Sequence, residues 1–305
     1  YQLYVCTCGA EYREVTAAAL GHSWGSWQTV TQAPTSSQGL QRRTCSRCGR
    51  TEEQSTAKLP ATQQNLVTEF VTRLYQLALG RTPTQAEAAD WVNRLLNGSF
   101  TGAQVAAGIV FSVEYQRKET SDASYVSMLY QTLLNREPRT DEVLFWIEYL
   151  DRGVTRGFIF QGFGGSVEFQ RLCEKYGVTA GKWYSEDVRD QNPDVTAFVT
   201  RLYRTCMGRE PDESGLKDWV TWILNGTQTG GQVVRGFVFS VEFQRKQLNN
   251  STYIEALYSA LFDRSSDVSG KQTWMNCLAS GQSREQVLDG FIYSVEFERL
   301  CARYG

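Results

Sequence analysis

The chain has 305 residues, of which 41% are apolar and 12% aromatic, with a formal net charge of −2 and a single histidine. This length predicts about two domains with buried cores, and the near-neutral charge gives no basic surface for nucleic acid or an anionic membrane. No apolar run reaches the roughly 18 residues of a membrane span, so we expect no direct membrane insertion. The sequence begins at Tyr1 without a signal peptide, and we expect it to be a fragment of a longer protein, with any export signal outside it.

Residues 1–60 predict a small β-rich module. Apolar and polar residues alternate at its start, and Thr, Gln, Ser and Gly are abundant, which favours short strands and turns over helices. Cys45-Ser-Arg-Cys48 has the spacing of a metal-binding knuckle, and Cys6-Thr-Cys8 resembles the same knuckle shortened by one residue. The module is therefore expected to have two cysteine knuckles.

Four thiolates from two knuckles suit a closed, structural zinc site, and a module of this size needs such a staple in order to fold. The four predicted metal ligands are Cys6, Cys8, Cys45 and Cys48. Two long-range disulfides are the alternative, if the protein is exported into oxidising surroundings. We expect His22 to be an ordinary turn residue and not a ligand.

From about Leu66 onward, one pattern recurs four times: an aromatic residue, Leu-Tyr, an Arg, a Trp, two Gly residues and finally Ser-Val-Glu. Each element of the second pair of copies lies 128 positions after its counterpart in the first pair. Self-similarity at a fixed period is typical of units that bury their apolar faces against one another. The recurring Tyr, Trp and Ser residues are Tyr75, Tyr130, Tyr203, Tyr258, Trp91, Trp146, Trp219, Trp274, Ser112, Ser166, Ser240 and Ser294.

Each copy predicts three to four helices. In the first copy, apolar residues with a helical period run from 70 to 78 and again from 88 to 96, and Gly98 then stands where a helix C-cap is expected. A third helix is expected from Gly102 to about Phe111, and Ser112 is expected to cap a fourth. About 50 residues are too few to be stable alone, so we expect two copies to close around a shared core.

The sequence therefore predicts a mainly α protein with four helical repeats of about 50 residues that form two tandem helical domains. The first domain is expected at 61–177 and the second at 192–305, joined by a linker at 178–191 that is rich in Gly, Asp and Asn. The β-rich Cys-knuckle module at 1–60 precedes both.

An Arg and a Glu recur in every copy. They are Arg81, Arg136, Arg209, Arg264, Glu114, Glu168, Glu242 and Glu296. Acid–base or carboxylate-binding roles are one interpretation. Fourfold recurrence favours the structural alternative, in which the Arg ties down a loop carbonyl or pairs with the Glu at the next helix start, and the recurring Trp residues anchor the core.

Catalytic signatures are missing from the sequence. No nucleophile elbow, zinc-protease helix, phosphate-binding loop or dinucleotide fingerprint is present, and His22 is the only imidazole available for a Ser/His or Cys/His pair. An active site with two catalytic carboxylates, as in glycosidases, is the enzymatic alternative that the sequence leaves open. We expect that the protein is not an enzyme.

The cysteines of the helical region do not recur as a disulfide framework would. Cys173 and Cys301 occupy equivalent positions, but Cys206 and Cys277 have Ala and Tyr as counterparts. We expect buried free thiols, with a bridge between Cys206 and Cys277 as the alternative.

A binding surface is expected where the copies differ. Trp183 and Tyr184 lie in the linker, and Trp222 stands where the other copies have Arg, Tyr and Cys. Exposed Trp and Tyr residues are common interface hot spots, which makes these three the predicted binding residues. The alternative is that they pack the linker or the seam between the two domains.

Several spaced motifs of the third copy agree with the other copies. They are Phe198-Val-Thr-Arg-Leu-Tyr203, Met207-Gly-Arg-Glu-Pro-Asp212, Trp219-Val220, Gly236-Phe-Val-Phe-Ser240 and Glu242-Phe243. Together these motifs resemble an all-helical domain family of bacterial secreted and cell-surface proteins that is catalogued only as a domain of unknown function. The resemblance covers about residues 66–305, although Thr84 and Ser265-Ser266 depart from it.

Residues 21–60, with Gly21-His22-Ser-Trp24 and the second knuckle, resemble a short Cys-knuckle repeat in surface proteins of Gram-positive gut bacteria. Together the two resemblances imply an extracellular or cell-surface location and supply no catalytic residues. The predicted function is a non-catalytic binding module that recognises a host protein (possibly an immunoglobulin), mucin or a polysaccharide. The alternative is a structural spacer or assembly scaffold on the cell surface.

Overall fold

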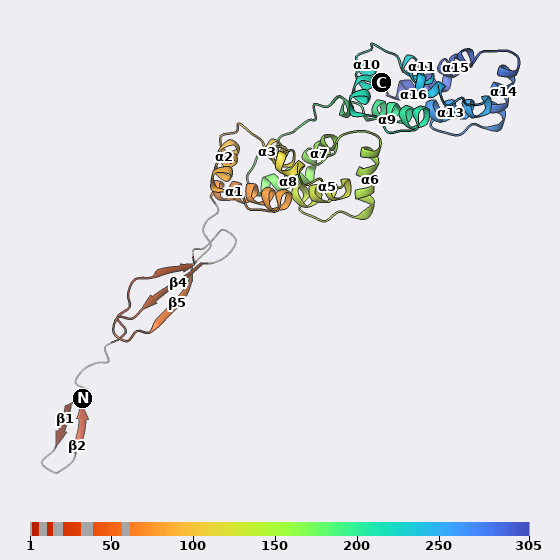
Figure 1. The fold of residues 1–305 in the computed structure, drawn as a ribbon. Helices are drawn as coiled ribbons and strands as arrows, with labels where there is room; N and C mark the ends of the chain where they lie inside the picture. Colours follow the sequence, from red (N-terminus) through yellow and green to blue (C-terminus); the bar gives the residue numbers. More distant parts are fainter. Residues whose placement is uncertain (1, 6–10, 15–20, 32–38, 57–61, 305) are drawn as a thin grey trace. The chain divides into compact units, whose positions relative to one another are not determined.

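The computed structural model describes residues 2–5, 11–14, 21–31, 39–56 and 62–304 (Figure 1). The chain divides into two compact units, Tyr1–Leu66 and Val67–Gly305, and each is described by itself. Cys6 and Cys8 lie outside the described residues.

The first unit is built from short antiparallel strands, as the composition predicted. Two of them, β1 (Gln2–Val5) and β2 (Glu11–Glu14), pair with each other. A three-stranded sheet has the order β3-β4-β5 and is formed by β3 (Gln28–Thr31), β4 (Gly39–Thr44) and β5 (Thr51–Thr56). Of the side chains that the structure describes in this unit, which do not include those of β1 and β2, Cys45 is the only buried one.

From Gln63 onward the chain is helical, which confirms the predicted fold class. The first two repeats contain α1 (Gln63–Leu74), the π-helical turn η1 (Tyr75–Leu79), α2 (Gln85–Leu96), α3 (Gly102–Val110), α4 (Val113–Gln116), α5 (Asp122–Leu129), the π-helical turn η2 (Tyr130–Leu134), α6 (Thr140–Asp151), α7 (Arg156–Gly164) and α8 (Val167–Lys175). The linker contains a 3₁₀ turn, η3 (Val188–Asp190). The last two repeats contain α9 (Pro193–Leu202), the π-helical turn η4 (Tyr203–Met207), α10 (Glu213–Leu224), α11 (Gly230–Val238), α12 (Val241–Gln244), α13 (Asn250–Phe262), α14 (Val268–Ala279), α15 (Arg284–Ile292) and α16 (Val295–Tyr304).

Helix ends fall where the sequence predicted them. Gly98 has a φ of 73°, in the left-handed region, and its three equivalents also have positive φ, so each closes the second helix of its repeat. Ser112 accepts a hydrogen bond from the backbone N–H of Tyr115 and caps α4, and the equivalent Ser residues cap their helices in the same way. The recurring Gly and Ser residues therefore set the helix boundaries in all four repeats.

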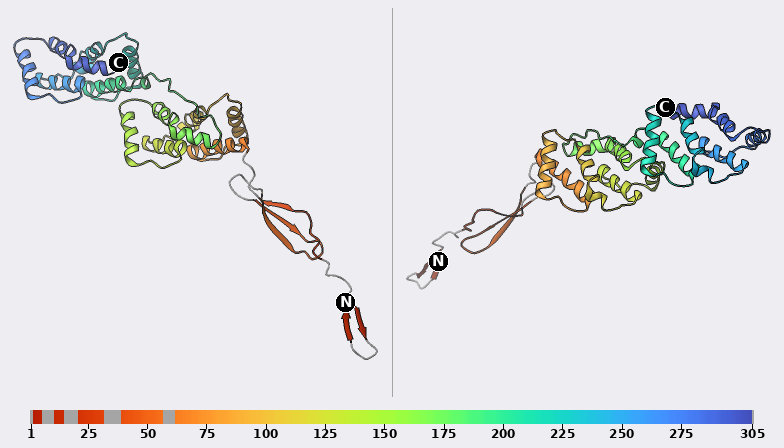
Figure 2. Two further views of the ribbon diagram at one scale, coloured as in Figure 1. Left: turned by 180° about the vertical axis from the view of Figure 1, so that it is seen from behind. Right: turned by 45° about the horizontal axis from the view of Figure 1, so that its top comes forward.

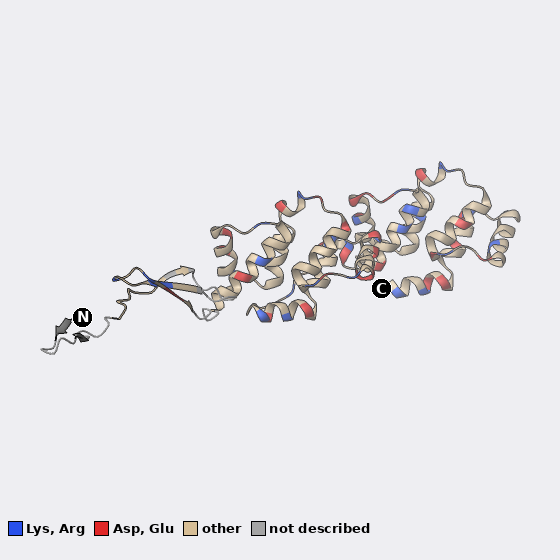
Figure 3. Ribbon diagram, turned by 90° about the horizontal axis from the view of Figure 1, so that it is seen from below, with Lys and Arg blue, Asp and Glu red and all other residues tan. Residues whose placement is uncertain are grey.

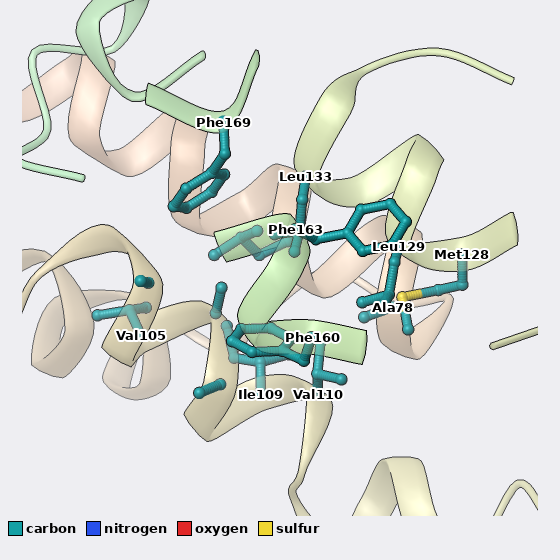
Figure 4. Packing of buried hydrophobic residues seen from close by; sticks show 14 of the residues in the cluster. Ala78, Val105, Ile109, Val110, Met128, Leu129, Leu133, Phe160, Phe163 and Phe169 are labelled. Atoms are coloured by element: carbon teal, nitrogen blue, oxygen red, sulfur yellow. The ribbon is translucent and has the colours of Figure 1, made fainter. Parts of the chain in front are cut away.

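Each pair of repeats encloses its own apolar core. In the first pair, Phe160 and Phe163 of α7 lie between residues of α3 and α5 such as Ile109 and Leu129, all of them almost fully buried (Figure 4). The second core has the same construction, with Phe237 of α11 at 0% exposure. The views of Figure 2 show the two halves as separate clusters of helices.

The two halves of the helical unit are in contact through polar groups. Asp190 of the linker is 6% exposed and accepts a hydrogen bond from the backbone N–H of Thr155, at 2.7 Å. Arg152 pairs with Asp194 at 2.6 Å, between Nη2 and Oδ1. The chain between the halves is therefore held to both of them.

Charged residues of both signs are interspersed along the helices (Figure 3). Among the described residues, no helix combines the length and the apolar character that a membrane crossing requires.

Candidate functional site

The recurring residues of the repeat form one cluster in the structure. In the first repeat, the Trp91 indole N–H donates to the Tyr75 hydroxyl at 3.1 Å, and the Arg81 guanidinium carbon lies 5.1 Å from the centre of the Tyr75 ring. Arg81 then donates two hydrogen bonds to the Glu114 carboxylate, both at 2.7 Å. Gly108 is required next to this cluster because a Cβ there would lie 2.9 Å from Cη2 of Trp91.

The other three repeats contain the same ion pair. The distances from Arg Nε to the Glu carboxylate are 2.9 Å for Arg136–Glu168, 3.0 Å for Arg209–Glu242 and 2.8 Å for Arg264–Glu296. This is the pairing that the structural interpretation of the sequence described. Because the Arg guanidinium and the Glu carboxylate bind each other in all four copies, the geometry favours a structural role over an acid–base role.

The first two repeats add a second carboxylate to the cluster. Arg136 also donates two hydrogen bonds to Glu142, both at 2.9 Å, and the backbone N–H of Arg139 donates to the same carboxylate. These hydrogen bonds, that of Arg136 above all, lower the pKa of Glu142 from 4.5 to about 2. The third and fourth repeats have Asp212 and Asp267 instead, at 3.6 Å and 3.9 Å from their Arg residues.

This geometry predicts an acid-sensitive step in stability. Because the pKa of Glu142 is lowered on folding, its contribution is fully present above about pH 4.5 and is lost as the pH falls towards about 2. We expect Glu142→Gln to lower the urea midpoint at pH 7 and to flatten its fall between pH 4.5 and 2.5. Glu148→Gln, at an exposed position of α6, is the matched control and should follow the unmodified protein. Identical acid limbs for both variants would show that the Arg136–Glu142 pair does not contribute.

A second cluster lies at the turn between β4 and β5. The Nδ1 atom of His22 is 3.2 Å from Sγ of Cys48, and the ligand atoms of His22, Cys45 and Cys48 all lie within 4.8 Å of one another. The sequence placed the Cys45–Cys48 knuckle in a metal site but treated His22 as a turn residue, and the structure brings that histidine to the thiols. The missed signal was the Gly-His-x-Trp run, since the β-bridge between Trp24 and Cys45 is what brings the histidine to the knuckle.

The environment of Cys45 favours the thiolate. Burial of the thiol acts to raise its pKa, but hydrogen bonds from the backbone of Arg47 and Cys48 and from the His22 and Cys48 side chains outweigh it and lower the pKa to about 6. Zinc bonds of about 2.0–2.3 Å put neighbouring tetrahedral ligand atoms about 3.5–3.8 Å apart. The three ligand atoms of this cluster lie within 4.8 Å of one another, so small side-chain shifts would bring them to these separations.

Trp183 is a packing residue of the linker. Its ring stacks on Phe111 with 5.1 Å between ring centres and meets Phe160 edge-on at 5.2 Å. This is the alternative that the sequence left open for it. Tyr184, the next residue, is instead 60% exposed.

Two hollows adjoin Tyr184, and Trp183 lines both. One has a volume of about 600 Å³ and is lined by aromatic residues together with Arg156, Asp187 and Arg189. The other has a volume of about 340 Å³ and includes Lys182 in its lining. The anchored Trp183 thus fixes Tyr184 between two concave surfaces that contain both apolar and charged groups.

Trp222 is placed elsewhere. It is 36% exposed, meets Trp219 edge-on at 4.9 Å and lines neither of the two hollows. Of the three predicted binding residues, the structure therefore brings together Trp183 and Tyr184 but not Trp222.

The cysteines of the helical unit are free thiols. Cys173 and Cys206 are buried, whereas Cys277 and Cys301 are partly exposed. Burial raises the pKa of Cys173 to about 12 and that of Cys206 to about 11. The structure thus has no bridge between Cys206 and Cys277, which agrees with the free-thiol expectation for these two residues.

A comparison with curated proteins found no match. A family model described as "Domain of unknown function (DUF4214)" matches four segments of the chain, residues 61–119, 106–173, 183–247 and 235–301. These segments contain the four Tyr–Arg–Glu–Trp clusters described above. The chain therefore belongs to this family of domains of unknown function, of which it contains four tandem copies.

Proposed function

We propose that the helical unit is a non-catalytic binding module of a bacterial secreted or cell-surface protein, and that it recognises a glycan chain of mucin or a polysaccharide at Tyr184. The observation that carries this proposal is an exposed aromatic ring held between two hollows by a half-buried, well-packed neighbour, Trp183. Concave surfaces with an aromatic lining and a few polar groups are the usual form of a binding site.

The charged groups of the larger hollow are already oriented by one another. Arg189 donates to Asp187 at 2.8 Å, between Nη2 and Oδ2, and Lys217 of α10 lies 3.1 Å from the same oxygen. The positive charge of Arg189 is compensated by Asp187, so this arginine does not require an anionic ligand. A neutral, hydroxyl-rich polymer can use these fixed donors and acceptors while its ring faces cover Tyr184.

Replacement of Tyr184 tests this function. We expect Tyr184→Ala to lower binding to a mucin-glycan and polysaccharide array at least tenfold without a change in thermal unfolding, since the side chain is largely exposed. Trp222→Ala is the control, because it removes an aromatic group of the same helical unit that lines neither hollow, and it should bind as the unmodified protein does. Equal binding by both variants would contradict the site. Capture of a serum protein instead of a glycan would transfer the proposal to a host protein such as an immunoglobulin.

A structural spacer is the second candidate function. It is favoured by the four Arg–Glu pairs, which serve the fold and leave no repeated group free for a ligand. Absence of binding to either the glycan array or host secretions would support it.

The module at the N-terminus is proposed to contain a structural zinc site with His22, Cys45 and Cys48 as ligands. A closed structural zinc site has four ligands, and the Cys6-Thr-Cys8 knuckle, which the sequence predicts to supply thiolates, lies outside the described residues. Zinc would crosslink the β4–β5 turn to the segment before β3, and it would supply no chemistry beyond that.

A further inference from the structure

The second half of the helical unit has an apolar groove beside the start of α11. Its volume is about 270 Å³. The groove is lined by Val195, Phe198, Ile223, Gly226, Gln228, Thr229, Gly230, Leu300, Cys301 and Tyr304.

The ten positions have counterparts 128 residues earlier in the first half. Eight of the ten pairs are identical in residue type, and the exceptions are Leu95 for Ile223 and Phe100 for Gln228. The counterparts are Val67, Phe70, Leu95, Gly98, Phe100, Thr101, Gly102, Leu172, Cys173 and Tyr176.

In the first half this position is filled by the start of the linker. The backbone N–H groups of Gly102 and Ala103, the first two residues of α3, donate to the carbonyls of Thr179 and Ala180 at 2.8 Å and 2.9 Å. Val178 is 7% exposed, and its Cγ1 atom would lie 3.1 Å from a Cβ placed on Gly102. An extended segment thus satisfies the open helix N-terminus and covers the apolar groove at the same time.

The second half lacks this cover. Among the described residues, no hydrogen-bond acceptor is found for the backbone N–H of Gly230 or Gly231, the counterparts of Gly102 and Ala103. Cys301 is partly exposed, whereas Cys173 is buried. A Cβ placed on Gly230 would lie 3.4 Å from the sulfur of Cys301, and a Cβ placed on Gly102 would lie 2.9 Å from the sulfur of Cys173, so the second half is packed less tightly here.

The difference continues along the surface. In the first half Trp183, five residues after Val178, stacks on Phe111. The counterpart of Phe111 is Phe239, which is 41% exposed. The uncovered surface therefore extends over the same path that Val178–Trp183 follows in the first half.

We propose that this groove is a binding site for an extended segment that resembles Val178–Trp183. Such a segment would be joined directly after Gly305, just as Val178 is joined after Gly177. The segment has a β-branched aliphatic residue first, for the space between Phe198, Gly230 and Cys301. Its next two carbonyls accept from Gly230 and Gly231, and an aromatic residue at its sixth position stacks on Phe239. This site is distinct from the Tyr184 surface and does not depend on the function proposed for it.

Extension of the chain tests the proposal. One variant carries Val-Thr-Ala-Gly-Lys-Trp after Gly305, and a matched variant carries Asp in place of the Val. The labelling rate of Cys301 by a thiol reagent is followed by mass spectrometry of its peptide, which separates it from the other cysteines. We expect the first extension to slow labelling of Cys301 at least tenfold and to protect the Gly230 and Gly231 amides from hydrogen exchange. The Asp extension should leave both rates as in the unextended chain.

Equal labelling of Cys301 in all three proteins would overturn the proposal. So would protection of Cys301 in the unextended chain that increases with protein concentration, because the groove would then be covered by a second copy. The Tyr184→Ala array result has no bearing on either outcome, so the two proposals fail separately.

Discussion

Treatment of the protein with a strong zinc chelator is expected to unfold the β3–β5 sheet and to leave residues 62–304 helical. The reason is that Cys45 is the only buried side chain among those described around this sheet, so these side chains form no apolar core that could hold it together. A structural zinc site supplies roughly 10–16 kcal/mol of apparent binding free energy, and this becomes folding free energy when the apo form has no core. Removal of the proposed zinc should therefore unfold the whole β3–β5 sheet.

Limited digestion with trypsin measures this effect. Arg42 and Arg43 are paired across the sheet with Glu53 and Glu52, so cleavage there requires that β4 and β5 separate. We expect chelation to expose both sites within minutes while the helical fragment persists, and His22→Ala to do the same without chelator. Arg94→Ala, which removes a basic side chain of α2 in the helical unit, is a control that should leave the sheet resistant. A sheet that resists trypsin after chelation but is cut after reduction would show that disulfides hold it instead.

Phe237→Ala is expected to destabilise the second half of the helical unit by about 3–5 kcal/mol. The ring is fully buried, meets Tyr203 edge-on at 4.8 Å and lies 5.2 Å from Trp219 between ring centres. Its removal leaves a cavity next to the Tyr–Arg–Trp cluster, whose aromatic groups lose their packing partner. Urea unfolding followed by tryptophan fluorescence gives the free energy.

Val241→Ala is the control for this prediction. Val241 lies four residues further on, directly after the capping Ser, and is 66% exposed, so its truncation should change the free energy of unfolding by less than about 0.5 kcal/mol. A loss below 1 kcal/mol for Phe237→Ala would mean that the core closes around the gap or that the ring does not anchor it.

Features that depend on local sequence were predictable. The capping Ser and the left-handed Gly residues each act within one helix turn, and their fourfold recurrence made the helix boundaries visible in the sequence. The pairing of Arg with Glu joins residues 32 or 33 positions apart, and it was one of the alternatives that the recurrence of both residues suggested. The π-helical turns η1, η2 and η4 were not predicted, because their longer hydrogen-bond spacing leaves no distinct residue pattern.

Features that depend on tertiary contact were only partly predictable. The second recurring Gly was visible as a pattern, but its reason, the close approach of the Trp Cη2 atom at Gly108 and its equivalents, appears only once the helices are packed. The proximity of His22 to the thiols was not predicted for the same reason, since Cys45 and Cys48 lie more than twenty residues away from it in the sequence. The roles of Trp183 and Tyr184 differ although they are adjacent, because the linker presents alternate side chains to opposite sides.

Because the linker is attached to the surface of the first half, the chain can lengthen under tension when this segment detaches. Val178–Trp183 is fastened by the hydrogen bonds from Gly102 and Ala103 and by the stacking of Trp183 on Phe111. A force that pulls the two halves apart would break these contacts one at a time, before it loads the helices of the first core. Six released residues span up to about 20 Å when extended. Such a segment would lengthen under a sudden pull and re-attach when the pull ends.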